Sequence, residues 1–292
     1  MKPVEVCINA ALEGGKAAAG VLEAKTNTKR DRDVGHHAIV GVADYTSQFE
    51  ILKTLRRLDP EAWYITEENV QDSKFRKFYV KSVSHLLAQR VYIIDELDGS
   101  SSHSIGHYEW SVSVGYVERL RHTAGAIYAP SVWGGALFSA ELGKGAWSQL
   151  GSDKPSRIKI GKRSLPQAYI LFGPDNFMPQ YPLHNKLTLK VADKARTINI
   201  CGSCALGLGM VAAGKADALI QPLQNVWDWT AGKLILEEAG GSISFYEMQR
   251  GKVIPIEHLK SEHYEPKERT LGFIAGNGAL VRELMKQLLA LQ

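Results

Sequence analysis

The sequence contains few of the features that mark secreted, membrane-spanning or disulfide-stabilised proteins. Cysteine occurs only three times in 292 residues, too few for a disulfide scaffold. The chain begins with no apolar segment that resembles a signal peptide, and no apolar run approaches the roughly 20 residues that span a bilayer. We therefore expect a cytoplasmic protein that does not associate with a membrane.

The charge balance argues against one class of partner. The 35 basic and 31 acidic residues give a net charge of +4, which is small for a chain of this length. Proteins that bind polymeric nucleic acid usually concentrate positive charge on one face, and here the basic residues are dispersed. We expect no polymeric nucleic acid partner.

The first half of the chain predicts helices that cover a meandering sheet. Residues 4–25 carry apolar and alanine positions at helical spacing, and Ser47 with Glu50 forms a capping-box pattern that predicts a helix starting just after Asp44. A further helix is predicted near 73–90. Strands are predicted at 62–67, 91–95, 111–118, 124–129 and 135–140.

The second half predicts strands interleaved with helices. Strands are predicted at 156–160, 168–172, 197–200, 216–221 and 242–246. Helices are predicted at 183–193, 204–214, 229–239 and 277–290. No long linker separates the halves, so we expect one compact α+β unit with an N-terminal half of residues 1–150 and a C-terminal half of residues 151–292.

The most informative segment runs from Ile93 to Ser101. It ends a strand-like run with two carboxylates, Asp95 and Asp98, followed by a turn rich in backbone donors. Mg²⁺ prefers oxygen ligands and leaves positions for water and phosphate oxygens. An Asp-x-x-Asp turn can aim both carboxylates and the Leu97 carbonyl at one point. Taken alone, the same pattern could simply cap a turn and the helix after it.

Three other segments change the weight of that pattern. Glu67 and Glu68 precede it, Gly202 to Leu206 follows it, and Trp227 to Gly241 reads Trp-Asp-Trp-Thr-Ala-Gly before Glu-Glu-Ala-Gly-Gly. Together the four segments resemble the inositol monophosphatase superfamily of Mg²⁺-dependent phosphomonoesterases, in the same order and with similar spacing. The resemblance runs from about residue 40 to residue 290. It implies the layered α-β-α-β-α sandwich of the inositol monophosphatase and fructose-1,6-bisphosphatase type, and a lithium-sensitive homodimer.

The resemblance implies a site for two Mg²⁺ ions. Glu68, Asp95 and the Leu97 carbonyl would hold one ion, and Asp95, Asp98 and Asp228 would hold the second. A third, weaker ion would lie near Glu68 through water. Such ions neutralise phosphate oxygens, activate a water and stabilise the leaving alkoxide.

The same resemblance implies which residues act on the substrate. Asp44, Glu68 and Ser100 would be catalytic, with Asp44 orienting the Ser100 hydroxyl toward the attacking water. Asp44 could instead be a first-turn charge that interacts with the helix dipole. The expected substrate-binding residues are Asp98, Gly99, Ser100, Ser101, Gly202, Ser203, Cys204 and Gln221.

Some positions depart from the family pattern. Glu96 stands where proline is usual, and we expect this extra acid to point to solvent. Gln221 stands where inositol-preferring members have an acid that contacts a substrate hydroxyl, and an amide lacks that charge. The expected substrate is therefore a class, a small phosphomonoester such as inositol monophosphate or a sugar phosphate.

Other interpretations stay open. A phosphatase acting on 3′-phosphoadenosine 5′-phosphate belongs to the same superfamily, and a non-catalytic binding protein could keep the fold. Cys201 and Cys204 have redox-type spacing, although no second ligand pair follows. His103 and His107 follow the phosphate turn and could contact substrate or be surface or core residues.

Overall fold

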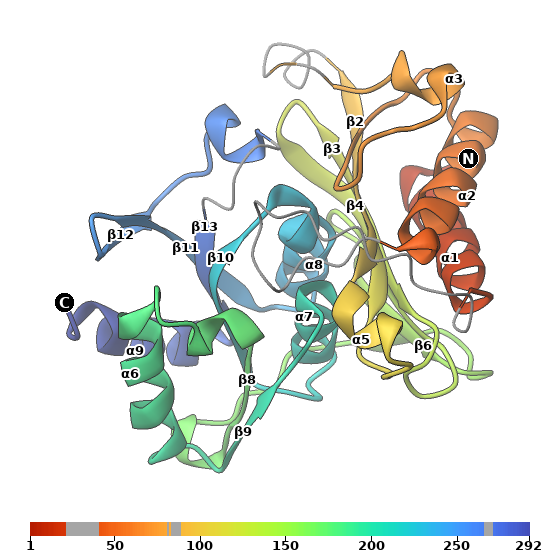
Figure 1. Cartoon of the computed structure of the whole chain (residues 1–292). Coiled ribbons are helices and arrows are strands. Elements are labelled where there is room, and N and C mark those ends of the chain that lie inside the picture. Colours follow the sequence, from red (N-terminus) through yellow and green to blue (C-terminus); the bar gives the residue numbers. More distant parts are fainter. Residues whose placement is uncertain (22–40, 81, 83–88, 266–270) are drawn as a thin grey trace.

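The computed structural model shows five layers in the order helix, sheet, helix, sheet, helix (Figure 1). It describes residues 1–21, 41–80, 82, 89–265 and 271–292. The helices of the outer layers are α1 (Pro3–Ala19), α2 (Val42–Leu58), α6 (Pro182–Ala192) and α9 (Gly278–Leu289). The helices of the central layer are α7 (Cys204–Ala212) and α8 (Val226–Glu238). The expected layered α+β fold is confirmed.

Strands of the first sheet follow one another in chain order. They are β1 (Trp63–Thr66), β2 (Arg90–Asp98), β3 (Ser111–Glu118), β4 (Arg121–Ala129), β5 (Ala136–Glu141), β6 (Gly145–Leu150) and β7 (Ser156–Ile158). Only β1 and β2 pair in parallel, with Thr66 opposite Ile94. The residues that follow β1 therefore lie beside the end of β2.

The second sheet has the order β12-β11-β13-β10-β8-β9. Its strands are β8 (Tyr169–Phe172), β9 (Thr197–Ile200), β10 (Ala218–Gln224), β11 (Ser242–Gln249), β12 (Lys252–Ile256) and β13 (Leu271–Gly276). Strands β12 and β13, like β6 of the first sheet, were not among those predicted, although β13 lies inside the sheet between β11 and β10. A Cβ at Gly272 would overlap the Pro222 carbonyl and the Tyr246 ring, so close packing requires glycine at this position.

Short helices complete the described structure. They are α3 (Ser73–Arg76), α5 (Ser100–Ser104), and the 3₁₀ helices η1 (Leu165–Gln167), η2 (Pro174–Phe177) and η3 (Ser261–Tyr264). The helix expected over 73–90 ends at Arg76, and Tyr79 then bridges to Tyr64 in the manner of a strand. Residues 81 and 83–88, and residues 22–25 of the first predicted helix, lie outside the described residues.

Helix α2 begins earlier than predicted. Its first residue is Val42, so Asp44 lies within the first turn, and its Oδ2 accepts the Gly41 N–H at 2.8 Å. An acid at this position satisfies a backbone donor that has no partner within the helix. The local effect is that Asp44 is held rigidly at the end of α2 that faces β2.

Helix α8 is apolar on nearly every side because it lies between the two sheets. Trp229 is fully buried, and Leu234 and Ile235 are buried with it. This packing fixes the first turn of α8, which carries Asp228, against the end of the first sheet. Among the described helices, none combines the length and apolar character needed to cross a bilayer.

Candidate active site

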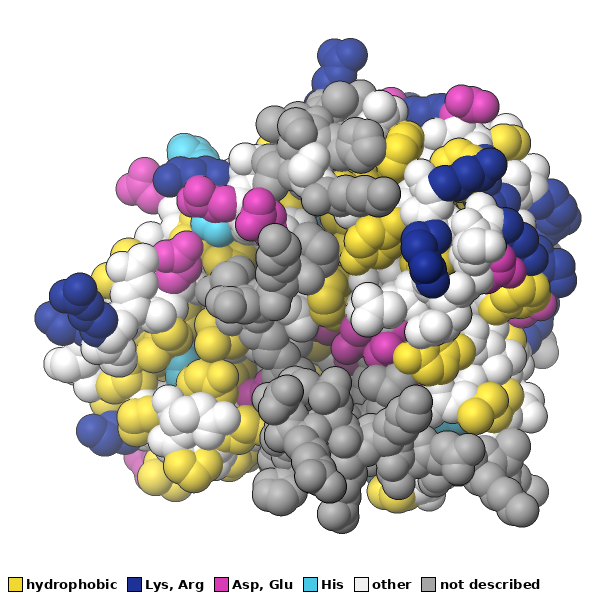
Figure 2. Space-filling model, turned by 45° about the horizontal axis from the view of Figure 1, so that its top comes forward, with side chains coloured by type: hydrophobic (Ala, Val, Ile, Leu, Met, Phe, Trp, Pro, Cys, Tyr) yellow, Lys and Arg dark blue, Asp and Glu magenta, His cyan; other side chains and the backbone are white. Residues whose placement is uncertain are grey.

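Carboxylates converge where β1 and β2 end and α8 begins. One group contains Asp95, Asp98 and Asp228, and a second contains Glu67, Asp95 and Glu96. Within each group, one carboxylate oxygen from every residue lies within 4.8 Å of the others. Acidic side chains are visible near the middle of the face drawn in Figure 2. Asp95 belongs to both groups and is therefore their shared centre.

Local backbone geometry aims these carboxylates. The pairing of β2 with β3 shifts register between Asp95 and Asp98, and such a bulge redirects side chains. The Asp95 Oδ1 accepts the Leu97 N–H at 3.0 Å, which fixes its orientation. On α8, the Asp228 Oδ2 accepts the Asn225 N–H at 2.6 Å in the first helical turn. The three predicted aspartates are thus brought together from elements far apart in the sequence.

Asp98 joins the turn at Gly99, Ser100 and Ser101 to helix α7. Its Oδ2 accepts hydrogen bonds from the Ser203 hydroxyl at 2.7 Å and from the Ala205 N–H at 2.5 Å. Gly99 follows with φ of 94°, and a Cβ there would lie 2.7 Å from the Glu109 carbonyl oxygen. The Gly202–Ser203 segment predicted from sequence therefore lies beside the turn, where Ser203 holds Asp98 in place.

The predicted contact between Asp44 and Ser100 is present. The Ser100 Oγ lies 2.8 Å from Asp44 Oδ1 and also 2.8 Å from the Leu97 carbonyl oxygen. One hydroxyl hydrogen can be donated to only one of these acceptors at a time. Burial raises the pKa of Asp44, with its hydrogen bonds to Gly41 and Ser100 opposing that effect.

Of the two adjacent glutamates, Glu67 is the one that joins the carboxylate groups. One of its carboxylate oxygens lies within 4.8 Å of Asp95 and of Glu96, whereas Glu68 lies beside Tyr45 and Asp44 and belongs to neither group found among the described residues. Burial, followed by the negative charge of Asp44, raises the pKa of Glu68 to about 7. The structure therefore places Glu67 where the sequence analysis expected Glu68.

Glu96 does not point to solvent, and that prediction is wrong. Its side chain is buried with 1% exposed, and its Oε1 accepts a hydrogen bond from Gln48 Nε2 at 2.6 Å. Burial raises its pKa to about 8. The physical reason is that helix α2 covers this end of β2, so the Glu96 side chain meets a helix instead of water, while one of its oxygens stays within 4.8 Å of Asp95 and Glu67.

Crowding of negative charge dominates the electrostatics of this centre. Burial raises the pKa of Asp95 well above its ordinary value, and the neighbouring carboxylates of Glu67, Asp98 and Asp228 raise it further. A bound cation would relieve this repulsion. The donors are carboxylate oxygens with a backbone carbonyl nearby, which is the ligand chemistry of a hard divalent cation such as Mg²⁺. The residues present therefore fit the metal that the resemblance implies.

Gln221 lies in a buried polar cluster of the second sheet. It is 2% exposed, and its Oε1 accepts a hydrogen bond from Gln224 Nε2 at 3.3 Å. The Gln224 Nε2 also lies 3.4 Å from Asp175 Oδ2, in the 3₁₀ helix that follows β8. The sequence analysis did not single out Asp175. This residue follows β8, and because β8 pairs in parallel with β10, the residues after both strands lie at the same edge of the sheet.

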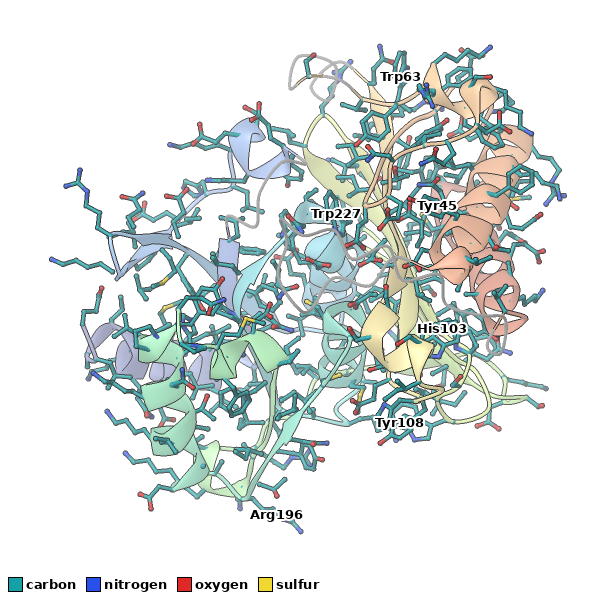
Figure 3. The ribbon with its side chains drawn as sticks, in the orientation of Figure 1. Tyr45, Trp63, His103, Tyr108, Arg196 and Trp227 are labelled. Atoms are coloured by element: carbon teal, nitrogen blue, oxygen red, sulfur yellow. The ribbon has the colours of Figure 1, made fainter. Side chains whose placement is uncertain are left out.

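The cysteines and histidines of the open alternatives have mainly structural surroundings. Burial raises the pKa of Cys201 to about 12 and that of Cys204 well above its ordinary value, so both remain thiols at neutral pH. His103 is buried, with Nε2 3.0 Å from the Ala18 carbonyl oxygen. His107 stacks on the exposed Tyr108. In Figure 3, His103 and Tyr108 lie below Tyr45 and Trp227.

Known proteins share both the sequence pattern and the fold. Residues 3–286 match the model of the inositol monophosphatase family. "Nus factor SuhB" of Haemophilus influenzae is 29% identical over 250 residues, which cover 82% of this chain and 85% of that protein. "Fructose-1,6-bisphosphatase/inositol-1-monophosphatase" of Thermotoga maritima is 26% identical over 256 residues, covering 88% and 84%.

Solved structures agree with this assignment. An IMPase of Thermotoga maritima superposes with a TM-score of 0.74 at 23% identity, covering 100% of this chain and 98% of that chain. The extragenic suppressor protein suhB of Bartonella henselae gives the same TM-score at 25% identity, with 97% of both chains covered. Because the family match extends over nearly the whole sequence, the chain belongs to the inositol monophosphatase family.

Proposed function

We propose that this protein is a Mg²⁺-dependent phosphatase that hydrolyses a small phosphomonoester, inositol monophosphate or a sugar phosphate, and releases orthophosphate. The observation that carries the proposal is the convergence of Asp95, Asp98 and Asp228 beside the Gly99 turn. Family membership supports it, because relatives in this family are named as phosphatases. The family resemblance also supports a cytoplasmic, lithium-sensitive homodimer.

The ligands follow from the carboxylate groups. Asp95, Asp98 and Asp228 would hold one ion, and Asp95 with Glu67 and the Leu97 carbonyl would hold another. Here Glu67 replaces Glu68 in the expected ligand set. When bound, Mg²⁺ supplies positive charge to phosphate oxygens and lowers the pKa of water.

Protein groups around the ions would orient the reaction. With its hydrogen donated to Asp44, the Ser100 Oγ keeps lone pairs that can accept a hydrogen bond from the attacking water. The raised pKa of Asp44 makes its carboxylate a stronger base than an ordinary aspartate. The N–H groups of Gly99, Ser100 and Ser101 are the expected phosphate donors, since glycine permits close approach of the backbone.

A non-catalytic role is the second candidate, because several relatives in the family carry the name "Nus factor SuhB". The acidic centre argues for catalysis: Asp44, Asp95, Asp98, Ser100 and Asp228 are all retained. Crowded carboxylates destabilise a fold unless a cation offsets their repulsion. A binding protein without turnover would have no need for that arrangement.

Phosphate release is the deciding experiment. The purified protein is assayed with Mg²⁺ and with a chelator on inositol 1-phosphate, fructose 1,6-bisphosphate, histidinol phosphate and 3′-phosphoadenosine 5′-phosphate. We expect Mg²⁺-dependent release from a polyol or sugar phosphate. Selective release from the adenosine bisphosphate would reassign the substrate, and no release despite measurable Mg²⁺ binding would favour the non-catalytic role.

A further inference from the structure

Glu96 occupies an unusual place for an acid that lies next to a metal-site residue. Both acids belong to the carboxylate group with Glu67, but only Asp95 also belongs to the group with Asp228 of α8, whereas Glu96 contacts Gln48 of α2. The two consecutive acids therefore have different surroundings. The buried carboxylate of Glu96 faces helix α2.

Both carboxylate oxygens of Glu96 already accept a hydrogen bond. Oε1 accepts from Gln48 Nε2 at 2.6 Å, and Oε2 accepts from the Glu67 N–H at 3.2 Å. The same Glu67 N–H also lies 3.2 Å from the Ile94 carbonyl oxygen, so the donor is shared. These contacts make Glu96 an acceptor for protein donors, which does not suit a primary metal ligand.

Gln48 extends this network to the next residue. Its Nε2 also donates to the Glu68 carbonyl at 2.8 Å, and the Thr66 hydroxyl donates to that same carbonyl at 2.8 Å. Ser47, one residue earlier on α2, donates to the Glu96 carbonyl at 2.7 Å. The main chain of Glu67 and Glu68 is thus fastened to β2 and α2.

These hydrogen bonds can fix the position of Glu67, which needs such support because it follows the last residue of β1 and lies outside any regular element. Its side chain is the exposed member of its carboxylate group, so packing alone does not fix it. We propose that Glu96, together with Gln48, is a positioning residue that holds the turn presenting Glu67 to the metal site. This inference rests on the proposed metal site. A proline could not fill the role because it has no side-chain acceptor.

The test measures Mg²⁺ binding by calorimetry on the full chain, without substrate. Glu96→Gln leaves one amide NH₂ facing either Gln48 or the Glu67 N–H, and we expect about 10-fold to 100-fold weaker Mg²⁺ binding, as for other residues that orient metal ligands. Gln48→Met removes the tether from the opposite side and should weaken binding similarly. The Gln48→Met variant also allows the proposal to be tested if the Glu96→Gln protein does not fold. Glu118→Gln, an exposed glutamate of β3, is the matched control and should bind as wild type does.

A double-mutant cycle separates positioning from ligation or general loss of structure. If Glu96 acts through Glu67, Glu96→Gln should cause little further loss in a Glu67→Gln background. High Mg²⁺ should also restore the kcat of Glu96→Gln. Equal losses in both backgrounds, or wild-type affinity in Glu96→Gln and Gln48→Met, would overturn the inference while leaving the phosphatase proposal intact. A wild-type protein that binds no Mg²⁺ would overturn both proposals.

Discussion

Two parts of the molecule, the acidic centre and the buried polar cluster around Gln221, differ in chemistry. The side built by the ends of β1 and β2 carries adjacent acids, including Glu67 and Asp95, whose repulsion a cation would relieve. The side built by β10 and the 3₁₀ helix after β8 carries neutral amides, Gln221 and Gln224, with Asp175 beside them. A cation held by the acids would attract the phosphate, which every substrate of the proposed class shares. Amides on the other side suit hydroxyl groups, which differ between substrates.

This comparison separates activity from selectivity. Changes on the acidic side should affect every phosphomonoester alike, because metal and phosphate are common to all of them. Changes on the amide side should alter the preference among substrates and leave the reaction itself in place. Each of the following predictions can break or sharpen that division.

The largest effect is expected for Asp95→Asn, which removes the charge shared by both carboxylate groups. Loss of metal-based stabilisation of several kcal/mol corresponds to about a 1,000-fold fall in kcat, for every substrate tested. Circular dichroism should show an intact fold, and Asp193→Asn, at an exposed position after α6, should keep full activity. Near-normal turnover in Asp95→Asn would remove the metal assignment.

A matched pair tests the choice between adjacent glutamates. Glu67→Gln should weaken Mg²⁺ binding by about 10-fold or more, as expected on losing a group that ligates or orients a metal. Glu68→Gln should change Mg²⁺ binding much less, since Glu68 lies beside Tyr45 and Asp44. Titration calorimetry on both variants decides the matter. The reverse order of effects would restore Glu68 as the ligand.

Stability without metal should depend on pH. The pKa of Glu68 is raised from 4.5 to about 7 and that of Glu96 from 4.5 to about 8, so the folded state holds protons that the unfolded state has lost. The free energy of unfolding should therefore fall as pH rises from about 4.5 to about 8. Urea unfolding in chelator measures this slope.

Mg²⁺ should reverse that trend, because it binds the ionised carboxylates of the folded state. Glu96→Gln should have a shallower slope in chelator, since one titrating group is gone. A free energy of unfolding that rises with pH in chelator would contradict the proposed crowding of buried acids.

The smallest effect is expected on the amide side. Gln221→Leu removes a polar group worth about 1 kcal/mol of hydrogen bonding, which corresponds to roughly a fivefold change in affinity. We expect KM for inositol 1-phosphate to rise by that factor, with kcat for a simple aryl phosphate unchanged. Equal effects on both substrates would show that Gln221 does not contribute to selectivity separately from activity.

Sequence order alone predicted much of the aspartate centre. Asp95 and Asp98 are three residues apart in a turn, so their proximity is a local property. Asp228 is far away in the chain, and its approach was predicted only because the motifs occur in the family's order. The proximity of Asp44 and Ser100 was anticipated in the same way, and the hydrogen bond between them is present.

Other features could not be predicted from local patterns. Strand β13 was not predicted, and the close approach of Pro222 and Tyr246, which requires glycine at position 272, is visible only in the folded chain. Glu96 was expected in solvent because nothing in its neighbouring residues indicates that α2 packs over it. The choice of Glu67 over Glu68 depends on how β1 aligns with β2, which neither glutamate determines by itself.

By itself, the sequence determined the family, the layered fold and the residue types of the acidic centre, because these follow from motifs whose order and spacing are properties of the chain. Only the tertiary structure decided which glutamate meets Asp95 and where the Glu96 carboxylate points. Side-chain direction depends on strand register and on the element that covers each face. Those are set by packing between segments that lie far apart in the chain.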